Sequence, residues 1–291
     1  MLKKTTKIYD FEDIRRVNEI ENLLNDLEAF VREGDYVGLD AVFVSLISKS
    51  TWSVGRILLR LQKYFVLGND QMINAYRDVL VQIGPRAIPE LKAFYKKNQG
   101  KNIFLEVASE IYISEMIDNY FSWQDHYLSE DSYYLRQYRL VDRIVQLGAP
   151  VVPQVVRNLM NVNIREYLIV ALGRIGDRRA TMVLTALLRE AQPIGFERIQ
   201  PIIPKLVRAL GNIGDRRAVR PLLHFLESDS FIGKTDAAEA IEKILDASFG
   251  NYQSFGKNKR SWHAYQRRVM NYLKSQEPGA YPMRLVRGNL P

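Results

Sequence analysis

The chain contains one ten-residue stretch twice, 38 residues apart. Residues 171–180 read ALGRIGDRRA and residues 209–218 read ALGNIGDRRA, so that only Arg174 is replaced, by Asn212. A period of about 20 to 50 residues is typical of a chain built from stacked units. Two weaker copies lie upstream, LVQIGPRAIPELKAFY at 80–95 and IVQLGAPVVPQVVRNLM at 144–160. The wide gap between these two predicts one degenerate unit at roughly 101–130.

Each copy predicts two helices joined by a tight link. Leu206, Leu210 and Ile213 recur at the spacing of one helical face. A glycine then ends the first helix, because it accepts the left-handed conformation, and a proline opens the second. The glycines are Gly84, Gly148, Gly176 and Gly214, and the prolines are Pro89, Pro153 and Pro221. Such a pair is apolar on two sides, so it must stack on its neighbours.

Gly173 and Gly211 lie inside first helices, where glycine costs about 1 kcal/mol against alanine, so we expect close helix packing there.

The remainder of the chain also reads as helical. Before the repeats we expect helices at roughly 10–33, 36–49, 52–67 and 71–83, with Ser50, Thr51, Asn69 and Asp70 as capping candidates. No stretch alternates with a period of two long enough to indicate a sheet. The predicted fold is all-α, an α-solenoid of stacked antiparallel helix pairs. We expect an N-terminal helical region at 1–75, repeats at 76–250 with an irregular aromatic-rich unit at about 100–140, and a basic C-terminal helix and tail at 251–291.

The units resemble the HEAT-like repeats of the bilin-lyase type, whose pattern is close to VRxxAxxALGxIGDxRAVxxLxxxL. The resemblance covers about residues 140–250 and is weaker at 75–97. Arg165 and Lys234 stand where the pattern has its arginine, whereas Ile203 takes that place in the 209 copy, so we do not expect an unbroken Asp–Arg ladder. The resemblance implies a protein-binding scaffold, and it also admits a bilin lyase or chaperone-like relative. A HEAT-like DNA glycosylase is a further alternative, with Trp123, Asp125 and the basic tail as its candidates.

Catalytic and metal-binding patterns are missing from the sequence. The chain has no cysteine, which excludes disulfides, thiolate metal ligands and a cysteine nucleophile. The densest set of other metal-ligating residues, Glu115, Asp118, Asp125 and His126, lacks the spacing of a metal motif. We therefore expect a non-catalytic protein without cofactor or metal.

The repeated aspartates invite a catalytic interpretation, which we weigh against a structural one. Asp177 and Asp215 each lie in the tight link between two predicted helices. An aspartate in such a link accepts backbone N–H bonds or pairs with a nearby arginine. The structural interpretation is the one we favour.

An aromatic concentration in the degenerate region is the first candidate binding surface. Eight aromatic residues lie within 27 positions: Tyr112, Tyr120, Phe121, Trp123, Tyr127, Tyr133, Tyr134 and Tyr138. Tyrosine and tryptophan combine an apolar body with a polar tip, which suits a surface that binds a partner. The alternative is that they fill an irregular joint in the stack. Our partner-binding candidates here are Tyr120, Trp123, Tyr127 and Tyr134.

The C-terminal region is the second candidate. Of the formal net charge of +8, residues 251–291 supply most, with eight basic residues and one acidic residue. Aromatic residues are interleaved with them, a mixture that stacks bases and neutralises phosphates. Trp262 and Tyr265 recur at helical spacing, so these residues could instead cap the stack. The candidates are Arg260, Trp262, Arg267 and Arg268.

The function we predict is a non-catalytic protein–protein interaction scaffold of the HEAT-repeat type. A long link at 189–201 supports it, because insertions in a solenoid gather on one face. The expected partner is another protein, an acidic one at the basic C-terminus, with nucleic acid as the alternative. No stretch approaches 18 consecutive apolar residues, and no apolar run follows the first basic residues, so we expect a cytoplasmic protein without a membrane span.

Overall fold

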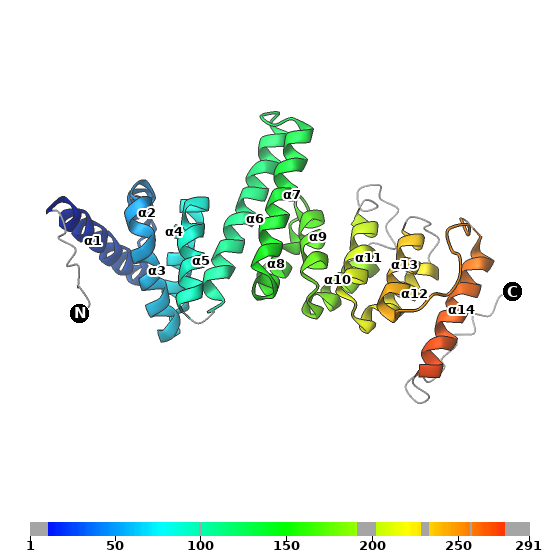
Figure 1. The fold of residues 1–291 in the computed structure, drawn as a ribbon. Helices are drawn as coiled ribbons and strands as arrows, with labels where there is room; N and C mark the ends of the chain where they lie inside the picture. The colour runs from blue at the N-terminus through cyan, green and yellow to red at the C-terminus, as the bar shows by residue number, and fades with distance from the viewer. Residues whose placement is uncertain (1–10, 99–100, 191–201, 228–232, 257, 277–291) are drawn as a thin grey trace, which may run out of the picture. The chain divides into compact units, whose positions relative to one another are not determined.

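The structure is a computed structural model, which describes residues 11–98, 101–190, 202–227, 233–256 and 258–276 (Figure 1). Across these ranges the regular elements are all helices, as the sequence predicts. The chain forms two compact units, Met1–Gln154 and Val155–Pro291, which divide inside helix α8 (Val152–Arg157). This division does not coincide with the expected segments at 1–75, 76–250 and 251–291, which follow changes in repeat character. The fold is an all-α helical-repeat solenoid.

The first unit is a run of helices joined by short turns. Its helices are α1 (Phe11–Glu33), α2 (Tyr36–Ser48), α3 (Ser50–Leu67), α4 (Asp70–Ile83), α5 (Ile88–Lys97), α6 (Ile103–Gln124) and α7 (Glu130–Leu147), with 3-10 turns at Gly84–Ala87 and Ala149–Val151. The expected N-terminal helices are confirmed to within two residues. Asn69 caps α4, because its side chain accepts a hydrogen bond from the Met72 amide at 3.1 Å. The cap expected at Ser50 or Thr51 is wrong: α3 begins at Ser50, and Lys49 precedes it without a side-chain cap bond.

A buried carboxylate joins three helices of this unit. Glu28 of α1 is 4% exposed, and it accepts hydrogen bonds from the hydroxyls of Tyr64 at 2.6 Å and Tyr76 at 2.8 Å. Arg60 of α3 adds an ion pair at 2.6 Å. Burial by itself raises the pKa of Glu28, but these hydrogen bonds and the arginine charge outweigh it and hold the pKa below its ordinary value. The carboxylate therefore stays ionised and ties α1 to α3 and α4.

The gap between the first two repeat copies is filled differently from the expectation. Residues 101–130 hold one long helix, α6, in place of a degenerate helix pair. This helix packs on α4 and α5 on one side and on α7 on the other. The sequence signal was weak here because most side chains along the first half of α6 are buried, so that apolar residues do not follow a single helical face.

The second unit contains the two strongest repeats. Its helices after α8 are α9 (Arg165–Ile175), α10 (Thr181–Glu190), α11 (Ile202–Ile213), α12 (Val219–Glu227), α13 (Lys234–Leu245) and α14 (Lys259–Gln276), with 3-10 turns at Asn158–Met160, Arg178–Ala180 and Arg216–Ala218. Gly176 and Gly214 end α9 and α11 with φ of +73° and +69°, which confirms the predicted left-handed joints. Pro221 lies in the first turn of α12, as expected. Of the long link at 189–201, residues 191–201 lie outside the described residues.

The two glycines inside the repeated stretch mark close contacts between helices. A Cβ at Gly173 of α9 would lie 2.6 Å from the Cα of Ala209 in α11. A Cβ at Gly211 of α11 would lie 3.0 Å from the Cα of Ala240 in α13. The Gly211 Cβ would also lie 2.9 Å from the Cβ of Ala240, and real Cβ atoms essentially never come within 3.0 Å of another such atom, so a larger residue would force a shift at both crossings. The close packing expected from the sequence is confirmed.

The repeated aspartates hold the links between helices. Asp215 is 6% exposed and accepts hydrogen bonds from the Arg217 amide at 3.0 Å and the Thr181 hydroxyl at 2.9 Å. It also pairs with the Arg217 guanidinium at 2.5 Å. Asp177 makes the equivalent bonds to the Arg179 amide and guanidinium. The structural interpretation of both aspartates therefore agrees with their contacts.

The pattern's arginine position has a role separate from these aspartates. Arg165 donates from Nε to the Leu159 carbonyl at 2.6 Å, and Lys234 donates from Nζ to the Leu226 carbonyl at 2.7 Å. Both carbonyls belong to the last turn of a preceding helix, where acceptors lack partners within the helix. Each basic residue thus satisfies a helix C-terminus.

Candidate protein-binding surfaces

A helical hairpin in the first unit carries the aromatic concentration. Figure 1 shows the shared end of α6 and α7 extending past the neighbouring α4 and α5. We call residues 118–138, at this end, the arm. The turn of the arm is fixed by bonds from the Tyr127 and Leu128 amides to the Ser122 carbonyl, at 2.8 and 3.2 Å. Ser129 then caps α7 by accepting a hydrogen bond from the Ser132 amide.

Stacked rings give the arm a packed interior. Trp123 of α6 stacks on Tyr133 of α7, with ring centroids 4.8 Å apart and planes 15° from parallel. Tyr133 is 3% exposed. Tyr120 meets Trp123 edge-on at 6.1 Å. Because these rings touch across the hairpin, they hold the ends of the two helices together.

The four predicted aromatic candidates divide into two groups in the structure. Tyr120 and Trp123 are half-buried and support the arm from within. Tyr127, at the turn, is 82% exposed, and Tyr134 on α7 is also exposed. The structure adds three exposed apolar or aromatic side chains that the candidates omitted: Phe121, Leu135 and Tyr138. Tyr138 stands four residues after Tyr134 and three after Leu135, spacings that bring side chains together on a helix and that were available in the sequence.

The arm is also acidic. From Asp118 to Leu135 the chain has four acidic residues and no lysine or arginine, while Arg136 and Arg139 follow on α7. Within the described chain no ion pair engages these four carboxylates. Glu130 and Asp131 lie in the first turn of α7, where the helix dipole favours acidic side chains. The arm thus joins exposed rings with unpaired negative charge.

The C-terminal candidates fall on α14, in the second unit. Trp262 is 3% exposed, and its indole N–H donates to the Gly256 carbonyl at 3.0 Å. Phe255 and Tyr265 meet its ring edge-on, at 5.1 and 6.3 Å between centroids. This position fits the alternative in which Trp262 caps the stack. It leaves no open ring face for a nucleic-acid base.

The three arginine candidates of α14 are exposed. In the part of the chain that the structure describes, no carboxylate pairs with Arg260 or Arg267. Arg268 is held in place, since its Nε donates to the Phe249 carbonyl at 2.5 Å. Of the other basic residues counted in the C-terminal region, Lys257, Arg284 and Arg287 lie outside the described residues.

No group of three or more histidine, aspartate or glutamate side chains in the described ranges is placed to hold a metal ion. Among the same residues, no helix is both long enough and apolar enough to cross a bilayer.

Stacked helix pairs with glycine joints define a helical-repeat protein, and a comparison with known families gives the repeat type. Residues 205–228, which run from α11 into α12, match the PBS lyase HEAT-like repeat family. A search of curated proteins found no match to the chain. The chain therefore contains a HEAT-like repeat at residues 205–228, within a fold of stacked helices.

Proposed function

We propose that the chain is a non-catalytic protein-binding scaffold and that the arm is its main docking element. The observation that carries the proposal is that the arm exposes the rings of Phe121, Tyr127 and Tyr134 while the stack of Trp123 on Tyr133 joins its two helices. Hot spots in protein interfaces are enriched in aromatic side chains. Tyrosine loses little conformational entropy on binding, because it has only two side-chain torsions.

The charge of the arm indicates the chemistry of its partner. Four carboxylates without ion pairs in the described chain lie in the same stretch of the arm as the exposed rings. Complementary charge steers association and disfavours wrong partners. The segment that docks on the arm is therefore a basic one with apolar side chains, whereas an acidic protein remains the expectation for α14.

Nucleic-acid binding is the second candidate function. Arg260 and Arg267 favour it, because they are exposed and unpaired among the described residues. The burial of Trp262 removes the ring that would have stacked on a base. We therefore rank nucleic acid below a protein partner.

Site-specific photo-cross-linking tests the scaffold proposal. Benzoylphenylalanine placed at Tyr127 reports contacts of the arm, and the same group at Met182 of α10, which is also exposed, serves as the control. We expect a discrete protein adduct from position 127 that is absent from position 182. Adding Tyr134→Ala and Leu135→Ala to the 127 variant should abolish the adduct. Identical adducts from both positions, or an adduct that survives these substitutions, would contradict the proposal.

A further inference from the structure

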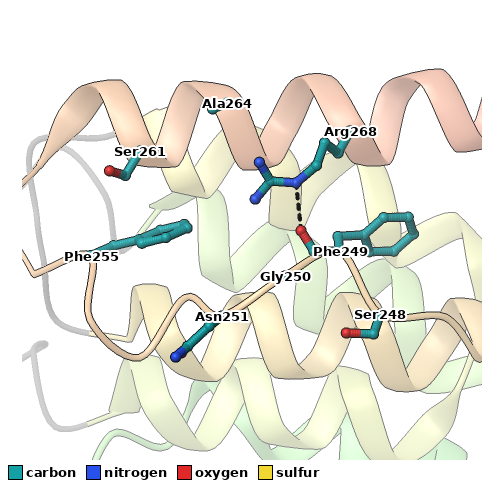
Figure 2. A pocket seen from close by; sticks show the side chains of 8 residues that line it. All are labelled: Ser248, Phe249, Gly250, Asn251, Phe255, Ser261, Ala264 and Arg268. Atoms are coloured by element: carbon teal, nitrogen blue, oxygen red, sulfur yellow. Dashed lines mark hydrogen bonds between the residues drawn. The ribbon is translucent and has the colours of Figure 1, made fainter.

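A pocket lies in the second unit, between α14 and the segment that follows α13 (Figure 2). Its volume is about 590 Å³. Its walls include Phe249, Gly250, Phe255, Ser261, Ala264 and Arg268. Of these lining residues only Arg268 is a C-terminal binding candidate, so the inference below deepens the expectation of an acidic partner for α14 and rests on it.

The guanidinium of Arg268 is fixed on one wall. Its Nε donates to the Phe249 carbonyl at 2.5 Å, the bond drawn in Figure 2. Its Cζ lies 5.9 Å from the ring centroid of Tyr265. A Cβ at residue 250 would stand 3.2 Å from Nη2, so Gly250 leaves room for the guanidinium. Gly250 also has φ of +111°, a conformation that other residues rarely adopt.

Most of the donors of this guanidinium are left for a ligand. Arginine has five N–H donors, and the Phe249 carbonyl uses the one on Nε. No carboxylate among the described residues pairs with Arg268. The nearby Glu242 is engaged by the Phe249 amide, which donates to it at 2.6 Å. The two Nη groups therefore form a preorganised fork without an anionic partner.

We propose that this pocket binds the carboxylate of an acidic peptide, with an apolar side chain of the peptide against Phe255. The fork of a guanidinium matches the two oxygens of a carboxylate. Arg268 is the only basic side chain among the pocket's described lining residues, which suits a single negative charge, whereas phosphate recognition employs clusters of arginines. Figure 2 shows the Phe255 ring reaching under the start of α14, on the side of the pocket away from Phe249. Ser261 supplies a hydroxyl on the same wall as Arg268.

The proposal does not rest on the arm, which belongs to the first unit. Titrations of the full chain followed by NMR test it, with the Gly250 amide and the Arg268 Nε–H as reporters. The probes are N-acetylphenylalanine, which has a carboxylate and a phenyl ring, its neutral amide, and phenyl phosphate. We expect saturable shifts with the carboxylate and none with the amide. Equal shifts with the amide, or tighter binding of phenyl phosphate, would overturn the assignment to a carboxylate.

Three variants locate the binding. Arg268→Gln and Arg268→Lys should each weaken the carboxylate by at least about tenfold, since a charge-assisted bidentate contact is lost. Lys274→Gln is the matched control on the same helix, outside the pocket's lining, and it should leave the affinity unchanged. Arg268→Lys keeps the positive charge, so it remains informative if Arg268→Gln lowers the melting temperature. Unchanged affinity in Arg268→Lys, or an equal loss in Lys274→Gln, would refute the site.

Discussion

Replacing Gly173 by alanine separates two opposite expectations. Alanine is the better helix former by about 1 kcal/mol, so propensity alone predicts a more stable protein. The structure predicts the reverse, because the new methyl would lie 2.6 Å from the Cα and 2.7 Å from the Cβ of Ala209. Overpacking of this kind costs about 1 to 3 kcal/mol, and backbone of a neighbouring helix cannot rotate away. We expect a net loss of stability of up to about 2 kcal/mol.

Urea unfolding followed by circular dichroism measures this change, with Gly55→Ala as the matched control. Gly55 also lies inside a helix, α3, but a Cβ there would meet only the end of the Glu90 side chain, at 3.1 Å. That side chain can move, so the control should be neutral or more stable by up to about 1 kcal/mol. If Gly173→Ala raises the urea midpoint as much as Gly55→Ala does, close packing of α9 on α11 is not the reason for the glycine.

Three further predictions concern the joints and the C-terminal helix. Gly214→Val should destabilise by a few kcal/mol, because a β-branched residue cannot adopt φ of +69°, and a melting curve that overlays the parent would refute this. Hydrogen bonds from Arg217, more than the other contacts, lower the pKa of Asp215 from 3.8 to about 2. The stabilisation of the folded protein by Asp215 is therefore complete above pH 3.8 and is lost as the pH falls through 2. Asp215→Asn should lack this acid-dependent loss in urea titrations at several pH values, and an unchanged profile would contradict the pairing. Trp262→Ala should lower the melting temperature, while fluorescence anisotropy with labelled oligonucleotides should show no specific loss of affinity. A loss of about 1 to 3 kcal/mol in binding with the fold intact would restore the base-stacking interpretation.

The repeat joints were predictable because their signals are local. A glycine at a helix end, a proline in the next first turn and an aspartate in the link each act within a few residues, and Gly176, Pro221 and Asp215 all occupy the expected places. The close crossing at Gly173 was predictable for a related reason, since a glycine inside a helix needs compensation from its neighbours.

The binding surfaces depended on contacts between distant residues, which periodicity does not reveal. From the sequence, Trp262 is a candidate for stacking on a base. In the structure the Gly256 carbonyl and the Phe255 ring contact its side chain. The position of Arg268 depends on the path of residues 248–256, which no repeat pattern specifies. The acidity of the arm could have been read directly, from the absence of lysine and arginine between Asp118 and Leu135.

The central claim is that the exposed side chains of the arm bind a protein partner. The most direct test measures the affinity of the protein captured at Tyr127 for a variant with Phe121→Ala, Tyr127→Ala and Leu135→Ala, by isothermal titration calorimetry. All three side chains are exposed, so the melting temperature should stay at the parent value. We expect the affinity of the arm variant to be at least about tenfold weaker than that of the parent and of a Met182→Ala control. Parent-like affinity in the arm variant would contradict the claim.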